Sequence, residues 1–224
     1  MEYKVERLGD IPFNINPREL YIYAGYRGKA TPDEAVQALI DECLSEVKES
    51  AEIRAVLKWC PIQRKKRSDG TEDDKKFSIG DFYIESEALG RNLRGCKDAI
   101  LVGATLSPSI DLLLHRYSKL QITKSVLMQA TAAAYIEGYL DEIQRVVKSR
   151  LDPEGLSLRP RFSPGFADFT TDYQKPFLEA IDAGRNLGIT LANNSNMMVP
   201  SKSVTAIMGI CEKGTEAVGA YENI

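Results

Sequence analysis

Residues 158–168 read LRPRFSPGFAD and separate a long helical segment from the start of another helix. Proline biases the residue before it towards extended backbone, and two prolines, Pro160 and Pro164, lie in this stretch. Gly165 follows directly, and glycine takes a positive φ without strain. The stretch is therefore predicted to run extended and then to bend sharply, so that a ligand can approach the main chain.

Two side chains make this stretch a candidate binding motif, Arg161-x-x-Pro164-Gly165-Phe166. Arg161 offers a planar fork of donors that suits a carboxylate or a phosphate. Phe166 offers an apolar face to a heterocycle or a cation. A surface loop that leads into a helix has a similar composition, and the residues alone leave both interpretations open.

The composition is that of an ordinary soluble globular protein, with 224 residues, 43% hydrophobic and 27% charged. The net charge of -3 provides no basic surface for nucleic acid. The N-terminus lacks the residue order of a signal peptide, and no apolar run approaches the roughly 18 residues that span a bilayer. We therefore expect a cytoplasmic protein that binds neither nucleic acid nor membranes.

Residue types that carry common chemistries are scarce. The four cysteines lie far apart, without a C-x-x-C pair or a histidine nearby, so we predict neither a metal site nor a redox pair. His115 is the only histidine, which removes most histidine-based acid–base schemes. The absence of a G-x-G-x-x-G motif and of a P-loop argues against a dinucleotide or nucleoside triphosphate fold. No catalytic residue is predicted.

Capping residues, turn residues and hydrophobic periodicity predict the secondary structure. Helices are predicted over residues 17–25, 32–49, 86–95, 107–120, 123–149 and 172–188. Strands are predicted over residues 53–62, 77–84, 99–106, 189–198 and 203–210, with the last two joined as a hairpin. Because the elements lack a sustained βαβα rhythm, we predict an α+β fold with a mainly antiparallel sheet flanked by helices. We expect a single domain over residues 1–224, with residues 1–15 as an N-terminal arm.

The longest predicted helix carries an acidic residue, Glu137, in the middle of an apolar stripe. The other residues of the stripe are Ile122, Val126, Ala130, Ala133, Leu140 and Val147. An unpaired carboxylate in apolar surroundings costs several kcal/mol, so Glu137 calls for a cationic partner from the protein or from a ligand. The three alanines at 132–134 would leave room for a bulky group against the helix. Alternatively, the helix leaves the core at Glu137 and the side chain reaches solvent.

Residues 161–168 (RFSPGFAD), 189–191 (ITL) and 197–207 (MMVPSKSVTAI) resemble the S-adenosylmethionine-binding activation domain of cobalamin-dependent methionine synthase. Residues 103–111 (GATLSPSID), with Arg116-Tyr117 after them, are similar to a stretch in its small stand-alone members. The resemblance covers about residues 15–212. It implies an activation module without the substrate and cobalamin domains.

In that family the module binds S-adenosylmethionine and presents its methyl group to oxidised cob(II)alamin on a partner domain. A flavodoxin- or ferredoxin-type donor supplies an electron. The resemblance thus implies a role in reactivating methionine synthase, with a cobalamin-binding synthase or another corrinoid protein as partner. It leaves open whether the chain is itself an enzyme, because the chemistry belongs to the cofactors.

The resemblance also implies roles for individual residues. Arg161 would hold the ligand's carboxylate or neighbouring polar atoms, and the Pro164-Gly165 bend would allow close backbone approach. Phe166 would lie against the sulfonium, and Glu137 would pair with the α-amino group. These groups match the charges of S-adenosylmethionine, which carries an anion, an ammonium and a sulfonium.

Two departures from the family pattern favour alternatives. Phe166 replaces the usual tyrosine, and a lost buried hydrogen bond of about 0.5–1.5 kcal/mol would weaken binding several-fold or more. A second family acid before the arginine has no clear match, since Asp152 and Glu154 are the only candidates. One alternative is a docking module that recognises a corrinoid protein without binding S-adenosylmethionine. Separately from these departures, a methyltransferase with a different acceptor is a third possibility.

Overall fold

The computed structural model describes residues 3–193 and 195–215. Its main sheet has seven strands, six of them in the order β4-β3-β2-β5-β9-β6, while β1 pairs with β2. All the strand pairings are antiparallel. Two further strands, β7 (Thr190–Leu191) and β8 (Met198–Val199), form a separate ribbon. The main-sheet strands are β1 (Val5–Leu8), β2 (Arg54–Lys66), β3 (Glu72–Ile79), β4 (Phe82–Glu85), β5 (Asp98–Thr105), β6 (Leu156–Leu158) and β9 (Ser203–Glu212).

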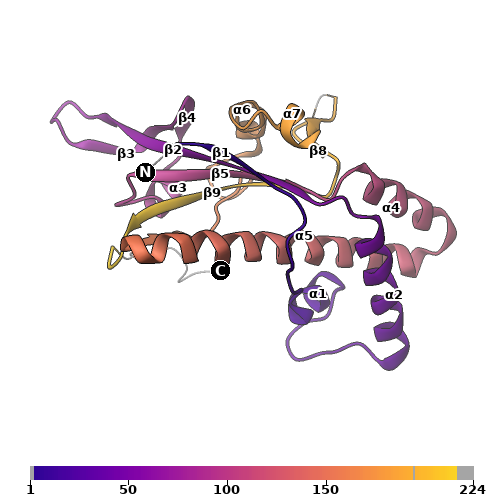
Figure 1. The fold of residues 1–224 in the computed structure, drawn as a ribbon. Helices are drawn as coiled ribbons and strands as arrows, with labels where there is room; N and C mark the ends of the chain where they lie inside the picture. The colour runs from indigo at the N-terminus through magenta and orange to yellow at the C-terminus, as the bar shows by residue number, and fades with distance from the viewer. Residues whose placement is uncertain (1–2, 194, 216–224) are drawn as a thin grey trace.

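Helices cover both faces of this sheet (Figure 1). The first face is covered by α1 (Pro17–Tyr23), α2 (Glu34–Ser50), α4 (Pro108–Leu120) and α5 (Ile122–Leu151). The second face is covered by α3 (Glu87–Asn92), α6 (Gln174–Ala180) and α7 (Ala183–Leu187). Two 3-10 turns, Asp152–Glu154 and Thr171–Tyr173, complete the elements. The predicted α+β fold with an antiparallel sheet between helices is confirmed.

Strand β5 shows why the sheet needs both helical layers. Alternate residues enter opposite cores, with Ile100 and Val102 on the α5 face and Leu101 on the α6 face. Every residue of the strand after Asp98 is buried, because both faces are covered. Gly103 leaves space for side chains of the α6–α7 layer, because a Cβ there would lie 2.6 Å from Ile181 Cδ1 and 3.0 Å from Leu187 Cδ1.

Local capping signals located the starts of α1 and α3 correctly, whereas α2 begins two residues later than predicted, after Asp33. The Asn16 side chain accepts a hydrogen bond from the Arg18 amide at 3.0 Å and begins α1. Ser86 accepts one from the Leu89 amide at 3.1 Å and begins α3. Such side chains satisfy N–H groups that have no partner within the helix.

Two predicted elements are divided in the structure. The strand predicted over residues 77–84 is split into β3 and β4, because Gly80 turns the chain with a φ of +57°. The helix predicted over residues 172–188 is split into α6 and α7, because Asp182 takes a left-handed conformation with a φ of +49°.

The predicted hairpin of residues 189–198 and 203–210 is wrong. Only Thr190–Leu191 and Met198–Val199 pair within this region, and they form the separate ribbon. Strand β9 instead lies between β5 and β6, where nearly all its residues are buried. A strand buried on both faces gains more from a central position in the sheet than from a local hairpin.

The N-terminal segment crosses α5 at Gly138. A Cβ at Gly138 would lie 2.9 Å from the Asn14 carbonyl oxygen and 3.3 Å from the Phe13 ring. The Phe13 ring packs edge-on against Tyr135 with centroids 4.8 Å apart, and the Tyr139 hydroxyl donates to the Gly9 carbonyl at 2.6 Å. The bulky group expected against this helix is therefore the chain itself, one turn beyond the alanines. Because of this crossing, α1 packs beside the middle of α5.

Candidate functional site

Arg161 lies on the edge of the sheet and points towards α5. After β6 the chain continues along β9, where Phe162 and Ile207 exchange backbone hydrogen bonds of 2.9 Å. Because neighbouring residues on extended backbone face opposite sides, Phe162 enters the core on the α6 face and Arg161 reaches the α5 face. The extended path predicted for this stretch places the arginine here.

The guanidinium of Arg161 is held by three side chains of α5. Its Nη2 donates to Glu137 Oε2 at 2.9 Å, and its Nη1 donates to Asp141 Oδ1 at 2.9 Å. The same Nη1 donates to Gln144 Oε1 at 3.3 Å. The Arg161 side chain is only 18% exposed. The cationic partner that Glu137 requires is thus Arg161.

The predicted apolar stripe around Glu137 is buried only in part: Ala130, Leu140 and Val147 are buried, whereas its first two residues are exposed. Ile122 is 80% exposed and Val126 is 55% exposed, so the line of residues that leads to Glu137 follows the border of the buried face. The Glu137 side chain is 25% exposed. The buried face of α5 differs from the predicted stripe because α2 and the N-terminal arm pack against this helix. The periodicity of the helix alone does not reveal either contact.

Helix α1 packs against α5, and the charges of this cluster act on two α1 residues, Glu19 and Tyr23, that were not predicted as part of the site. Burial raises the pKa of Glu19 above its usual value, and the negative charges of Asp141 and Glu137 raise it further. Burial, Glu137 and Glu19 likewise raise the pKa of Tyr23, although its ring is 45% exposed. The signal in the sequence was an acid and an aromatic four residues apart, on one face of the helix that Pro17 starts.

The predicted bend forms at Gly165, whose φ is +99°. The Gly165 amide donates to the Phe169 carbonyl at 2.7 Å, and the Phe166 amide donates to the Ser163 carbonyl at 3.3 Å. Pro164 lies inside this turn. The Phe166 ring is 48% exposed and packs edge-on against Phe162, with centroids 5.3 Å apart.

The structure therefore brings Arg161 and Glu137 together but gives Phe166 a different environment. The Phe166 ring contacts Phe162, which belongs to the core on the α6 face. Asp152 and Glu154, the candidates for a second acid, lie in the 3-10 turn after α5, where Asp152 pairs with Lys213 at 3.3 Å. The acids near Arg161 come instead from α1 and α5.

Asp168 ties the same loop to α3. Its carboxylate accepts hydrogen bonds from Ser86 Oγ at 2.6 Å and from the Glu87 and Ala88 amides at 2.6 and 3.1 Å. Partial burial opposes ionisation of Asp168, but these donors lower its pKa below the usual value. Asp168 thus caps α3 and fixes the end of the loop that carries Arg161.

We predict that Asp168→Ala lowers the free energy of unfolding by about 1 kcal/mol at pH 7, the usual value of a helix cap. Because folding lowers the pKa of Asp168, its contribution is complete above about pH 4 and is lost as pH falls through the folded value. Urea denaturation should show that the difference between wild type and Asp168→Asn shrinks as the pH falls from 4 to 2. Asp81→Asn at an exposed turn is the control, and an equal effect of both variants would contradict the capping role.

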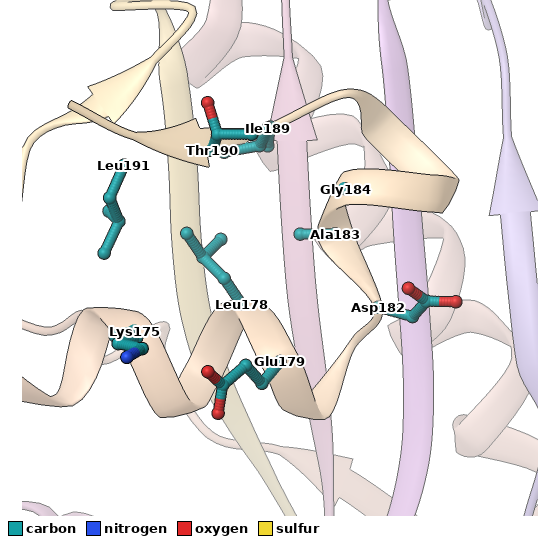
Figure 2. Close-up of a pocket in the computed structure, with 9 residues that line it drawn as sticks. All are labelled: Lys175, Leu178, Glu179, Asp182, Ala183, Gly184, Ile189, Thr190 and Leu191. Carbon is teal, nitrogen blue, oxygen red and sulfur yellow. The ribbon is translucent and has the colours of Figure 1, made fainter. Parts of the chain in front are cut away.

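A separate cavity of about 360 Å³ lies between α6, α7 and β7 (Figure 2). The apolar side chains of Leu178, Ile189 and Leu191 line it, and Lys175 and Glu179 lie on the α6 side. These elements cover the second face of the sheet, whereas Arg161 contacts α5 on the first face. The cavity is therefore distinct from the predicted site.

Within residues 3–193 and 195–215, none of the helices combines the length and apolar character that a membrane crossing requires. In the same described residues, no group of three or more His, Cys, Asp or Glu side chains is arranged to hold a metal ion.

No protein-family model matches the sequence. None of the curated proteins matches it either. Thirteen chains of solved structures match the fold, among them the crystal structure of the MetH reactivation domain bound to AdoHcy (S-adenosylhomocysteine). That match covers 92% of this chain and 78% of the other, with a TM-score of 0.64 and 13% identity. The predicted resemblance is therefore confirmed at the level of architecture: this chain has the fold of the methionine synthase reactivation domain.

Proposed function

We propose that the chain binds S-adenosylmethionine beside Arg161 and presents its methyl group to the cob(II)alamin of a partner protein. In this proposal it serves the reductive reactivation of cobalamin-dependent methionine synthase. A neighbour of the same fold is described as bound to S-adenosylhomocysteine, the demethylated form of that ligand. The observation that carries the proposal is the pair of Arg161 and Glu137, whose nitrogen and oxygen atoms lie 2.9 Å apart.

Counting donors and acceptors supports the fit of the ligand's amino acid group. A guanidinium has five N–H donors, and three of those on Arg161 are used by Asp141, Gln144 and Glu137 within the described residues. Two donors thus remain for a carboxylate. Glu137 uses Oε2 for Arg161, and Oε1 remains for an ammonium group.

In this arrangement the chain binds and orients S-adenosylmethionine. The cofactors supply the transferable methyl group and the metal that accepts it. Arg161 and Glu137 would fix the amino acid end of the ligand. The exposed ring of Tyr23 lies beside the acids, and that of Phe166 lies on the same loop as Arg161. Either ring can cover an apolar or cationic part of the ligand.

Calorimetric titration of the purified chain with S-adenosylmethionine, alone and together with a corrinoid protein, tests the proposal. We expect binding with one ligand per chain. Absence of binding in both titrations would contradict it.

A docking module for a corrinoid protein, without S-adenosylmethionine binding, is the second candidate. Two observations favour it: Asp141 already pairs with Arg161, and Phe166 has no hydroxyl group. Its expected result is capture of the corrinoid protein with no response to S-adenosylmethionine.

A further inference from the structure

Strand β7 has an outer edge that no other strand of the described residues pairs with. Its inner edge pairs with β8, and the ribbon is closed by a hydrogen bond of 2.9 Å from the Ala192 amide to the Met197 carbonyl. In an antiparallel ladder, backbone groups that face the partner strand alternate with groups that face away from it. Because Ala192 faces β8, the N–H and C=O of Leu191 face the outer edge.

This edge borders the cavity of about 360 Å³, and α6 forms the opposite wall (Figure 2). Buried apolar residues, Leu178, Ala183 and Ile189, line the cavity together with the half-buried Leu191. Gly184 adds no side chain, and a Cβ there would meet no atom closer than 4.0 Å. The cavity therefore has room for an apolar side chain next to unpaired backbone groups.

Charged side chains of opposite sign lie along the α6 wall. Lys175 lies near the Leu191 end of the cavity, whereas Glu179 and Asp182 follow towards the other end (Figure 2). All three residues are exposed. Within residues 3–193 and 195–215, none of them takes part in a salt bridge. The cavity thus offers a positive end and a negative end to a ligand.

From these features we propose that the cavity is a docking site for an extended peptide segment of a partner protein, which adds a strand to the outer edge of β7. An apolar residue of the segment lies opposite Leu191 and enters the cavity. An acidic residue two positions before it faces Lys175, and a basic residue two positions after it faces Glu179 and Asp182. The site lies on the face of the sheet opposite Arg161 and does not depend on the proposed function.

An extended peptide matches all of these features at once. Its backbone supplies the acceptor and the donor that pair with the N–H and C=O of Leu191. Alternate side chains of a strand point to the same face, so an apolar residue and the residues two positions away all face the cavity. An antiparallel segment begins at the Lys175 end, which places its acidic residue first and its basic residue last.

Two pentapeptides of equal composition test the order of charges, Glu-Thr-Leu-Thr-Lys (acidic-first) and Lys-Thr-Leu-Thr-Glu (basic-first). Both are amidated and carry the same fluorescent label through a Gly-Gly spacer, so that their termini are alike. Fluorescence anisotropy measures their binding to the intact chain. At low ionic strength we expect the acidic-first peptide to bind about tenfold more tightly, with a smaller ratio at high salt.

N-methylation of the peptide tests the pairing with β7. A methyl group on the leucine amide removes the donor that faces Leu191, and it should abolish binding of the acidic-first peptide. The same group on the following threonine amide lies on the edge that faces away from β7, because donors alternate along a strand. That peptide is the matched control, and we expect it to bind like the unmodified one.

Lys175→Glu tests the charged wall. It should weaken the acidic-first peptide, strengthen the basic-first peptide and so abolish the tenfold ratio. Lys119→Glu makes the same charge change at an exposed residue of α4, on the other face of the sheet, and should leave the ratio unchanged. Circular dichroism verifies that both variants keep the fold.

Each contrary result overturns the proposal in a different way. If neither peptide binds at millimolar concentration, the cavity is not a peptide site. If both bind equally, or if Lys175→Glu leaves their ratio unchanged, charge does not select the segment. If the two N-methylated peptides bind alike, the edge of β7 is not used. If the wild-type chain dimerises and the peptide separates the dimer, the occupant is a second copy of this chain.

Discussion

Arg161→Ala should weaken the binding of S-adenosylmethionine about a hundredfold. The substitution removes the two donors available to the ligand's carboxylate, and hydrogen bonds to a charged group contribute about 1.5–3 kcal/mol each. It also leaves Glu137 and Asp141 without their shared cation. The dissociation constants of wild type and variant, measured by titration calorimetry at one salt concentration, check this expectation.

Arg145→Ala is the matched control for this experiment. Arg145 lies on α5 and pairs with Glu142, three residues before it. We expect this variant to bind the ligand like wild type. Equal affinity of Arg161→Ala and wild type would contradict the assigned role of Arg161. If Arg161→Ala keeps a corrinoid partner and wild type does not respond to S-adenosylmethionine, the docking module is the better description.

Gly138→Val should lower the free energy of unfolding by about 3 kcal/mol, because it adds volume to a packed crossing. Any Cβ at this position would meet the Asn14 carbonyl at 2.9 Å and the Phe13 ring at 3.3 Å. The side chain must push the N-terminal segment away from α5. Urea denaturation measures the loss of stability.

The same substitution should weaken ligand binding, since the displaced segment leads directly into α1 with Glu19 and Tyr23. Gly184→Val on α7 is the control, because a Cβ there would meet no atom closer than 4.0 Å. If both valine variants lose the same stability, the low helix propensity of valine explains the effect. Packing of the N-terminal segment against Gly138 would then not be its cause.

The parts of the fold that local chemistry determines could be predicted from the sequence. Asn16 and Ser86 cap helices through atoms two or three residues away, so a short window contains the whole signal. The strand predicted over residues 99–106 corresponds closely to β5 for the same reason. The partners of β9 could not be predicted, because they lie about one hundred residues away in β5 and fifty in β6.

The part of the site that lies within residues 158–168 could be predicted, because its residue types determine the local backbone. Arg161, Pro164 and Gly165 form the extended arm and bend that their residue types indicated. The chain itself supplies the partner that Glu137 needed. Glu19 and Tyr23 were missed because the packing of α1 against α5 depends on where the N-terminal segment crosses α5, which helical periodicity does not reveal.

Strand β9 is the last strand of the described residues, yet it occupies an interior position of the sheet. During synthesis on the ribosome, the edges of β5 and β6 stay unpaired until residues 203–212 have left the exit tunnel. We therefore expect the nascent chain to depend on chaperones until a late stage, and chains that stop before Ser203 to aggregate.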